Sequence, residues 1–449
     1  MNIDVPEGAR LIIGRLEKAG FEAFVVGGCV RDSLLGYEPK DWDVCTSALP
    51  DDSLDVFKDF RVIATGLRHG TITIIVNDVT FEVTTYRIDG DYSDNRRPDS
   101  VEFTRSLKED LARRDFTINS MAYNPSAGLV DHFGGADDLK ACVVRCVGDP
   151  AKRIREDALR IMRALRFASS IRFSIEGTTA AVMSENRRLL GNIAAERIAA
   201  ELNGLLLGDG FRKIAVENLD IVTEVIPELS QGIGFEQNNQ YHCYDVLTHI
   251  LFSVESAPKD VQLRLAMLLH DVAKPECYSE KDGIGHFYGH ALVGDDIAKR
   301  VLSRLKYDND TIHTVCELIK YHDAIIPARR KVVKRWLNKI GEVRLRQLVE
   351  VKRADAKAQV PARGEEKIAE LVKVLALIDD VIEKGQCFSL KDLAVNGRDL
   401  IDAGIPEGVN VGNILNMLIN MVIDEQIPNE RQALLEIVDN TVSEIDSTE

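Results

Sequence analysis

The sequence predicts an α+β fold, in which a head of mixed strands and helices closes near Pro150 and helical segments follow. In the first third of the chain, short apolar and β-branched runs are separated by glycine, asparagine and aspartate, a pattern typical of strands and turns. From Glu156 onward, apolar residues recur at helical spacing instead. Neither part contains an internal repeat or a low-complexity segment.

Length and composition narrow the class of protein. At 449 residues the chain is too long for one hydrophobic core and suggests about three domains. Hydrophobic residues make up 45% of it, yet no apolar run approaches the ~20 residues of a membrane span, and MNIDVPEGAR does not read as a signal peptide. We therefore expect a soluble, cytoplasmic protein with no membrane partner. Its eight cysteines form no CxxC pair, which argues against a zinc ribbon or a disulfide framework.

The net charge of −16 argues against a nucleic-acid partner, because a polyanion needs local cations to displace its counterions. Two basic segments could nevertheless supply the local cations that a nucleic acid needs, although such a segment is more often only a solvated helix face. They comprise Lys152, Arg153, Arg155, Arg160, Arg163 and Arg166, and then Arg329, Arg330, Lys331, Lys334, Arg335, Lys339, Arg344 and Arg346.

The first elements surround a double glycine. A helical pattern from Glu7 to Ala19 ends at Gly20, and a short apolar strand follows from Phe24. Gly27 and Gly28 come directly after this strand, where a residue without Cβ lets backbone amides approach a phosphate closely. A helix is expected to open at about Val30, with Arg31 in its first turn. A helix N-terminus favours anions, so this stretch predicts a triphosphate cradle.

Asp41 and Asp43 are expected on the second strand. Alternate strand residues face the same way, so the two carboxylates would lie on one face about 7 Å apart. Paired carboxylates beside a phosphate cradle are suited to Mg²⁺ and to phosphoryl or nucleotidyl transfer. An isolated Asp-x-Asp, however, is more often a pair of solvated acids.

The rest of the head can be followed in order. A helical stretch near 53–59 precedes a hairpin that turns at Asn77 and Asp78. Glu82, on the second arm, is a candidate third metal ligand, and an outward-facing strand glutamate is the equal alternative. The polar stretch from Ile88 to Asp99 predicts a mobile loop. The segment from 113 to 119, RRDFTIN, joins a short helix to a strand, and a turn, a short helix and a last strand follow Asp131.

Beyond the head, three helical segments are predicted: 156–168, 194–207 and 211–234, the last broken at Pro227. In the first of them, Asp157, Arg160, Arg163 and Arg166 recur every three positions, which by itself describes an amphipathic helix with i,i+3 ion pairs.

Histidines and aspartates recur at the ends of apolar helical runs from about Tyr241 onward. Neutral imidazoles together with carboxylates suit Mn, Fe, Co, Ni or Zn. A single histidine on an apolar face is usually a satisfied core residue, but this repeated spacing is more specific. The residues are His249, His270, Asp271, His286, His290, His322, Asp323 and Asp355.

Four ordered motifs resemble the class II tRNA nucleotidyltransferases, the family of the bacterial CCA-adding enzymes, and their poly(A) polymerase relatives. The motifs are GGCVRDSLLG, DWD, RRDFTINSMAYN (113–124) and EDALRIMRALRFA (156–168).

The resemblance implies a DNA polymerase beta-type nucleotidyltransferase head with a five-stranded mixed sheet, followed by an all-helical neck, body and tail. It further implies template-independent addition of CCA to the 3′ end of tRNA from CTP and ATP. By position in the motifs, Asp41 and Asp43 would hold two Mg²⁺ ions, and Gly28, Arg31 and Arg114 would bind the nucleotide. The alternative for Arg114 is a buried Arg/Asp ion pair.

In the same family, Asp157 and Arg160 would read the incoming base, because an aspartate accepts from the exocyclic amine that C and A share. Arg163 and Arg166 would support these readers or hold phosphate. A loop similar to the 88–99 stretch is associated with adding the terminal A, and relatives that add only CC lack it.

The histidine constellation resembles the HD metal-hydrolase domain. By position its ligands would be His249, His270, Asp271, His290, His322 and Asp355, a set that could hold two transition-metal ions. The domain would hydrolyse phosphoesters or serve only as a tRNA-contacting scaffold. The last segment, which contains Asn396 and Gly397, resembles the tail of bacterial CCA-adding enzymes. The implied domains are head 1–150, neck and start of body 151–235, HD domain 236–362 and tRNA-binding tail 363–449.

Two alternatives remain open. A poly(A) polymerase or an A-adding enzyme would share the head and neck motifs. A protein of another class, an HD phosphohydrolase or a nucleotide sensor, would need a head that binds NTP without catalysis, although the Asp41/Asp43 pair is intact.

Overall fold

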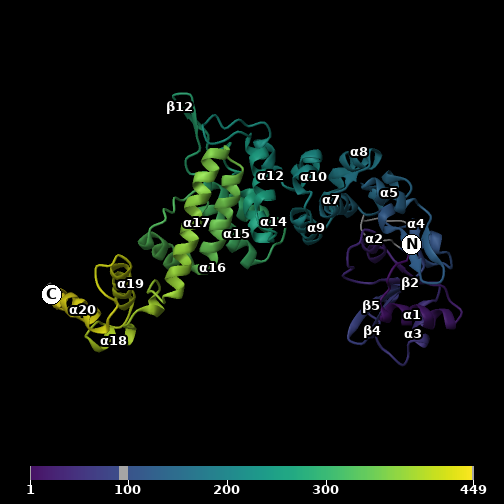
Figure 1. The fold of residues 1–449 in the computed structure, drawn as a ribbon, viewed down its shortest axis with the longest axis horizontal. Coiled ribbons are helices and arrows are strands. Elements are labelled where there is room, and N and C mark those ends of the chain that lie inside the picture. Colours follow the sequence, from purple (N-terminus) through teal and green to yellow (C-terminus); the bar gives the residue numbers. More distant parts are fainter. Residues whose placement is uncertain (1, 91–99, 447–449) are drawn as a thin grey trace. The chain divides into compact units, whose positions relative to one another are not determined.

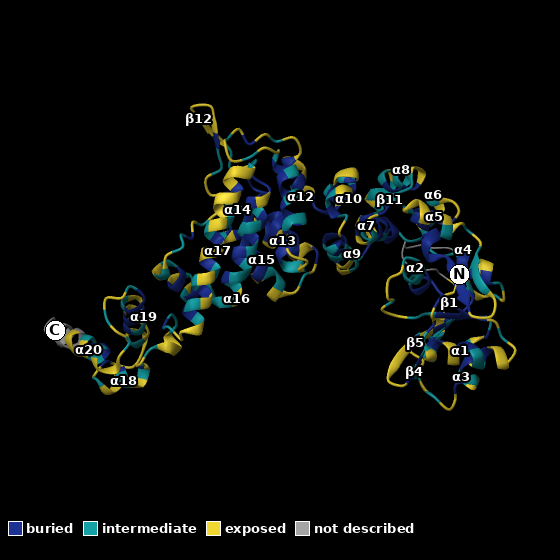
Figure 2. Cartoon of the chain, viewed as in Figure 1, coloured by how far each residue is buried: buried dark blue, intermediate teal, exposed yellow. Residues whose placement is uncertain are grey.

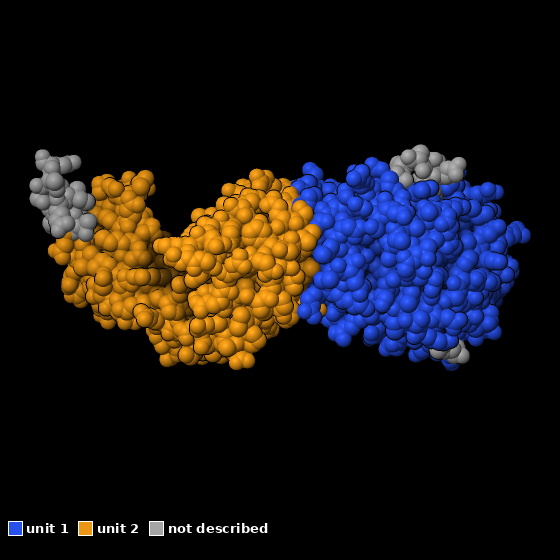
Figure 3. Space-filling view, turned by 90° about the horizontal axis from the view of Figure 1, so that it is seen from above, with its two compact units in different colours: residues 1–227, 304–306 blue, residues 228–303, 307–449 orange. Residues whose placement is uncertain are grey.

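The computed structural model describes residues 2–90 and 100–446 (Figure 1). The chain forms two compact units, Met1–Pro227 with Arg304–Lys306, and Glu228–Ser303 with Tyr307–Glu449 (Figure 3). The main boundary falls at Pro227, where the sequence predicted a helix break. No helix in the described part of the chain is both long enough and apolar enough to cross a membrane.

The head is built on one seven-stranded sheet with the order β3-β4-β5-β2-β1-β8-β9. β2 and β5 pair in parallel and the other neighbours are antiparallel, so the sheet is mixed, as predicted. The strands are β1 (Ala23–Val26), β2 (Val44–Thr46), β3 (Arg61–Ile63), β4 (Thr71–Val76), β5 (Val79–Thr85), β8 (Met121–Asn124) and β9 (Gly128–Asp131).

The predicted number of five strands was wrong. The outermost strands, β3 and β9, are three and four residues long and contain no buried residue. Because each has only one neighbour, neither carries the buried apolar run by which a strand is recognised in a sequence. The predicted last strand is β10 (Val143–Val144), which pairs instead with β11 (Ser174–Ile175) in a separate two-stranded sheet.

The β4–β5 hairpin is confirmed. Asn77 and Asp78 both have positive φ, 51° and 64°, which is the conformation that a two-residue hairpin turn requires. Along β4 every second residue is buried, and Thr73 pairs with Glu82 across the hairpin. Glu82 is therefore on the face opposite the buried side chains Ile72, Ile74 and Phe81.

The helices of the head are α1 (Glu7–Lys18), α2 (Gly28–Leu34), α3 (Pro50–Val56), α4 (Leu107–Ala112) and α5 (Gly135–Ala141). α2 begins before Val30 because Gly27, at φ 84°, already turns the chain into the helix. Short strands β6 (Arg87–Asp89) and β7 (Val101–Phe103) pair at the base of the predicted 88–99 loop, so its first residues are ordered. Positions 91–99 lie outside the described residues.

The neck helices are α6 (Pro150–Glu156), α7 (Leu159–Ile171), α8 (Gly177–Asn186), α9 (Ala195–Leu207), α10 (Phe211–Glu217) and α11 (Leu219–Val225). Asp157, with φ −139° and ψ 102°, separates α6 from α7, so the predicted continuous helix over 156–168 is broken at its second residue. α7 and α9 pack against each other, and each carries several buried residues (Figure 2).

The second unit is mostly helical, as predicted, with one short hairpin, β12 (Ser279–Lys281) and β13 (Ile284–His286). Its helices are α12 (Val246–Ser256), α13 (Val261–Leu269), α14 (His290–Arg304), α15 (Asn309–Tyr321), α16 (Arg330–Lys357), α17 (Pro361–Glu383), α18 (Gly397–Asp402), α19 (Val409–Ile423) and α20 (Arg431–Asp446). The last three enclose a hydrophobic cluster of their own that includes Leu400, Leu418 and Leu434. Asn396 caps α18, as its position before a predicted helix suggested.

Candidate active site and metal centre

The double glycine lies where β1 passes into α2. Gly27 donates its N–H to the carbonyl of Met121, and a Cβ at this position would lie 3.1 Å from Nη1 of Arg114. The positive φ and this close approach both require glycine. A Cβ on Gly28 would meet nothing closer than Arg31 at 3.8 Å, so of the two predicted glycines Gly27 is the one that the surrounding protein requires.

Asp41 and Asp43 precede β2 instead of lying on it, which corrects the sequence prediction. The carbonyl of Asp43 still accepts the N–H of Val26 from β1, so the residues just before β2 are held beside the end of β1, in the interior of the sheet, without being part of a regular strand. Val44 of β2 pairs with Val83 of β5 in parallel register, and this brings Asp43 next to Glu82.

The charges of two neighbouring carboxylates act on Asp43. Burial raises the pKa of Asp43 to about 6, the charges of Asp41 and Glu82 add to the rise, and Arg114 opposes it. Crowded carboxylate oxygens are the donor set that Mg²⁺ neutralises, so the residues present fit this ion. They do not form a closed site, because the described groups of three or more potential ligands that converge within 4.8 Å all lie in the second unit.

Arg114 joins the double glycine to the carboxylates. It is ion-paired with the buried Asp110 at 3.3 Å, and its Nε is buried without a hydrogen-bond acceptor. Burial acts to lower the pKa of Arg114, but Asp110 outweighs it and raises the pKa. The Arg/Asp pair of the alternative interpretation is therefore present, and the acid is Asp110 rather than the neighbouring Asp115.

Three of the other four predicted arginines gather around one aromatic ring. The guanidinium carbons of Arg31, Arg163 and Arg166 lie 5.0, 5.3 and 4.1 Å from the ring centroid of Phe167. Arg31 also donates to Asn119 Oδ1 at 2.7 Å. The structure thus brings together the cations of the first motif and of the last.

Asp157 lies at the break between α6 and α7. Its carboxylate accepts the backbone N–H of Leu159 at 3.1 Å and pairs with Arg197 of α9 at 3.2 Å. The side chain keeps 17% of its surface exposed, so one face of the carboxylate is accessible. Arg197 was not among the predicted base readers, although it stands near the start of a predicted helix.

Arg160 is more enclosed, with 9% of its side chain exposed. Its Nη1 donates to Glu156 and to the carbonyl of Arg153, both at 2.9 Å. Its Nη2 donates to the carbonyl of Arg113 at 3.0 Å. In this arrangement Arg160 holds the break between α6 and α7 in place, and base reading by its guanidinium requires that some of these bonds be exchanged.

Asp115 anchors the neck to the head and provides a stability test. Burial acts to raise its pKa, but Arg163 and Arg160 outweigh it and lower the pKa to about 2. Asp115→Asn should lower the free energy of unfolding of the first unit by about 3 kcal/mol at pH 7. Because the folded-state pKa is below the unfolded value of about 3.9, the stabilisation is present above that pH and is lost as the pH falls toward 2.

The chain has two tryptophans, Trp42 in the first unit and Trp336 in the second. In a Trp336→Phe background, urea unfolding followed by Trp42 fluorescence reports the first unit alone. The Asp115→Asn difference should shrink as the pH is lowered from about 4 to 2. Asp137→Asn removes an exposed pair with Lys140 and is the matched control with no expected change. A difference that is independent of pH would contradict the linkage.

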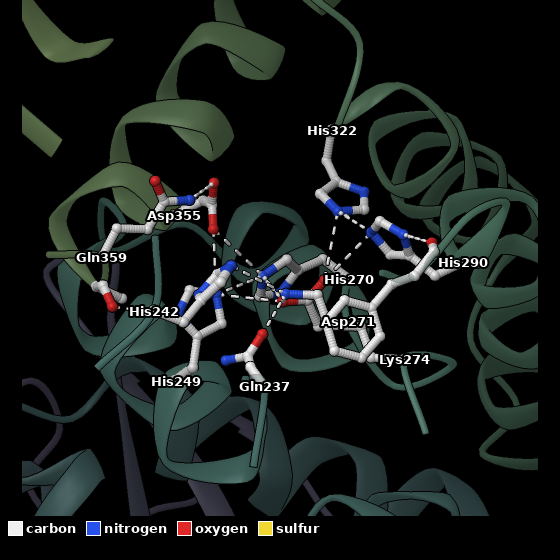
Figure 4. A network of polar contacts seen from close by, with 12 residues as sticks. Gln237, His242, His249, His270, Asp271, Lys274, His290, His322, Asp355 and Gln359 are labelled. Atoms are coloured by element: carbon white, nitrogen blue, oxygen red, sulfur yellow. Dashed lines mark hydrogen bonds and ion pairs between the residues drawn. The ribbon is translucent and has the colours of Figure 1, made fainter. Parts of the chain in front are cut away.

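The histidine constellation forms one buried cluster in the second unit (Figure 4). The six predicted ligands fall into two groups that share Asp271: His249, His270, Asp271 and Asp355 in one, and Asp271, His290 and His322 in the other. Within each group, one ligand atom per residue lies within 4.8 Å of all the others. His286, which stacks on Tyr288, and Asp323 lie outside both groups.

Asp271 presents one oxygen to each group. Oδ2 lies 3.2 Å from Nε2 of His249 and 3.1 Å from Nε2 of His270. Oδ1 lies 3.4 Å from Nε2 of His290 and 3.5 Å from Nε2 of His322. Both oxygens are buried and neither is in a hydrogen bond of good geometry.

The four imidazoles have the same orientation. The Nδ1 of each lies within 3.2 Å of a backbone carbonyl, that of Ala358, Met267, Phe287 or Ile319. We assign the proton to Nδ1 in each ring, because a carbonyl can only accept, and the Nε2 lone pairs then point inward. Nε2 of His249 and His270 are 3.3 Å apart, and those of His290 and His322 are 3.2 Å apart. Converging lone pairs and carboxylates repel unless a cation separates them, so the donor set fits two metal ions.

The charges in the cluster support this conclusion. Burial alone would raise the pKa of Asp271, yet His270 and Lys274 hold it well below its usual range. Burial would likewise lower the pKa of His270, but Asp271 and Asp355 raise it to about 9. Without a metal ion the cluster therefore takes up a proton, and metal binding displaces it.

Four residues around the cluster were missed by the sequence analysis. Lys274, one helical turn after Asp271, lies 2.7 Å from Asp271 Oδ2 and donates to Gln237 Oε1 at 2.8 Å. Gln359, one turn after Asp355, donates to Asp355 Oδ2 at 2.8 Å. His242 packs edge-on against His249. The i+3 and i+4 spacings were a usable signal for Lys274 and Gln359, whereas Gln237 and His242 lie outside regular elements.

Comparison with known families assigns three parts of the chain. Residues 23–145 match a model described as "Poly A polymerase head domain". Residues 172–231 match one described as "Probable RNA and SrmB- binding site of polymerase A", and residues 287–438 match one described as "tRNA nucleotidyltransferase domain 2 putative".

Two curated relatives are similar over nearly the whole chain. The CCA-adding enzyme of Limosilactobacillus fermentum is 36% identical over 430 residues, covering 96% of this chain and 95% of the relative. That of Pediococcus pentosaceus is 34% identical over 436 residues, with 96% and 97% covered. Among solved structures, the Bacillus stearothermophilus CCA-adding enzyme in complex with CTP is 26% identical, has a TM-score of 0.72 and covers 98% of each chain. The Thermotoga maritima CCA-adding enzyme complexed with tRNA has the same fold, with a TM-score of 0.61 over 98% of this chain and 100% of that one, at 21% identity.

Proposed function

The chain belongs to the CCA-adding enzymes, and from this premise we propose that Asp41 and Asp43 carry its nucleotidyl transfer. The enzyme adds C, C and A to the 3′ end of tRNA from CTP and ATP. The observation that supports the site is the crowding of Asp41, Asp43 and Glu82 beside Arg114 and the double glycine. We propose a cytoplasmic location, where tRNA and nucleoside triphosphates are found.

The residues of the head have separable tasks. Asp41, Asp43 and Glu82 would hold Mg²⁺, which when bound lowers the pKa of the ribose hydroxyl and neutralises the triphosphate. Arg114, fixed by Asp110, lies close enough to Asp43 to act on its charge, and its guanidinium would bind triphosphate oxygens. Gly27 keeps the backbone close enough for Arg114 to reach them, and Gly28 and Arg31 complete the cradle.

Base selection belongs to the neck. The accessible carboxylate of Asp157 accepts from the exocyclic amine common to C and A, which U and G do not present in the same place. A cation beside Asp157 supplies the second contact: Arg160 after exchange of its present bonds, or Arg197, its present partner. Arg163 and Arg166 support this region through Asp115, Glu201 and the ring of Phe167.

The test of this function is an extension assay. With Mg²⁺ and a tRNA lacking its terminal CCA, we expect CTP alone to give two additions and CTP with ATP to give three, after which extension stops. EDTA should abolish all additions. Extension only of a tRNA that ends in CC would identify an A-adding enzyme, and a long A ladder on unrelated RNA would identify a poly(A) polymerase. The full-length relatives named CCA-adding enzymes favour the first outcome.

A second activity is supported by the cluster around Asp271. We propose that it holds two transition-metal ions, with His249, His270 and Asp355 on one side and His290 and His322 on the other. Such a site activates water for attack on a phosphoester, and a phosphate or a 2′,3′-cyclic phosphate at an RNA 3′ end is the expected substrate class. The tail from 363 onward remains, as predicted, the proposed holder of the tRNA.

A further inference from the structure

His242 is a fifth imidazole at the metal cluster, and its role differs from that of the other four. Its ring lies edge-on against the ring of His249, with centroids 4.8 Å apart and planes at 90° (Figure 4). It belongs to neither ligand group. No backbone carbonyl holds its Nδ1, whereas each of the other four imidazoles is held in that way.

The neighbouring lysine determines which nitrogen of His242 carries the proton. Lys274 Nζ, an ammonium that can only donate, lies 2.7 Å from Asp271, 2.8 Å from Gln237 Oε1 and 3.5 Å from Nε2 of His242. The nitrogen that faces the ammonium must be the acceptor, so the proton of the neutral ring is on Nδ1.

This Nδ1–H is buried and has no hydrogen-bond acceptor in the described structure. A buried donor without a partner is costly, and a folded protein retains one mainly where a ligand or water completes it. The nearby carboxylates, Asp271 and Asp355, are ion-paired with other imidazoles and with Lys274, and no described residue accepts a hydrogen bond from Nδ1 of His242. The acceptor that this geometry leaves for Nδ1–H is a bound ligand or a water molecule.

We infer that His242 binds substrate at the second site, by donating its Nδ1–H to an oxygen of a phosphate group held at the cluster. The inference rests on the proposed second activity and adds a substrate contact to the six metal ligands. Lys274 has a companion role: its charge favours the same oxyanion, and its bond to Nε2 fixes the tautomer that allows His242 to donate. The ligand class is a tetrahedral phosphate oxyanion, a phosphomonoester or a cyclic phosphate.

Two substitutions separate donation from packing. His242→Asn places an amide N–H near the position of Nδ1, whereas His242→Gln places its amide near Nε2, where it can still accept from Lys274 but leaves no donor at Nδ1. Full-length protein loaded with Mn²⁺ is titrated with inorganic phosphate by calorimetry, and the bound manganese is measured separately.

We expect all three proteins to hold the same amount of manganese. His242→Gln should bind phosphate about tenfold more weakly than the wild type, and His242→Asn should recover most of the affinity. Equal phosphate affinity in His242→Gln and wild type would overturn the inference, because Nδ1–H would then serve only a water molecule. Loss of manganese in His242→Gln would also overturn it and would make His242 part of the metal site. A wild type that binds no manganese would instead overturn the second activity itself.

Discussion

Replacing Asp43 with alanine is expected to slow nucleotidyl transfer about a thousandfold while the affinity for tRNA changes by less than about twofold. A carboxylate that holds a catalytic metal ion contributes several kcal/mol to stabilisation of the transition state, and a thousandfold loss corresponds to about 4 kcal/mol. Asp43 is the most suitable of the three carboxylates for this test, because its pKa responds to both Asp41 and Glu82 and it is therefore central in the group.

The measurement combines single-turnover extension of a tRNA lacking CCA with a separate binding titration of the same tRNA. Asp51→Ala, on an exposed residue in the first turn of α3, is the matched control and should extend tRNA at the wild-type rate. If tRNA affinity fell together with the rate, Asp43 would have a structural role. A rate that stayed within tenfold of the wild type would rule out the proposed metal site.

The second large effect is expected at Asp271. Asp271→Asn should empty the cluster of metal, because its two oxygens face the imidazoles of both groups and an amide cannot replace a shared carboxylate. Opening of a 2′,3′-cyclic phosphate at an RNA 3′ end to a phosphomonoester, and release of phosphate from an RNA that ends in a phosphomonoester, should both disappear. CCA addition should stay within about twofold of the wild type, since its residues belong to the first unit.

Elemental analysis of the purified proteins checks this prediction. His322→Gln, which removes a ligand from only one group, should retain about half of the metal, and His313→Ala, on an exposed histidine of α15, should retain all of it. Continued tRNA extension by Asp271→Asn shows that the first unit has folded, and a helical circular-dichroism signal equal to that of the wild type shows the same for the second unit. Full metal content in that variant would exclude Asp271 as the shared ligand.

Much of the fold could be predicted because its signals are local. The Asn77–Asp78 turn, the alternation along β4 and the glycine that ends α1 each depend on the conformational preferences of one or two residues. The edge strands β3 and β9 could not be predicted, because a strand with a single neighbour buries too little to leave a pattern. The break at Asp157 was also missed, since the run of apolar residues continues through it and the interruption is held by Arg160, a tertiary interaction.

In the candidate sites, too, the sequence indicated features that depend on residue type and missed those that depend on tertiary contacts. Residue types and order alone indicated eight histidines and aspartates, and the resemblance to the HD domain reduced them to the six that the structure brings together. The sequence could not indicate which residues orient these side chains. The carbonyl of Ala358 bonds to Nδ1 of His249, and Gln359 donates to Asp355. The role of both contacts at the cluster depends on the packing of the α16 region beside α12. The sequence allowed Glu82 to be either a metal ligand or an outward-facing strand residue. The first alternative is favoured only by the parallel register of β2 and β5, which places Glu82 beside Asp43.

The single carboxylate shared by the two groups of the cluster has a thermodynamic consequence. If both proposed ions bind, an ion in either subsite would draw on the negative charge of Asp271 and would also hold its carboxylate in place for the other subsite. The two binding equilibria would then be linked, and whatever factor the first ion imposed on the affinity of the second, the second would impose on the first. Metal occupancy of the two subsites should then follow a cooperative or anticooperative binding curve rather than the sum of two independent curves. Asp271, which belongs to both ligand groups, is the residue that couples them.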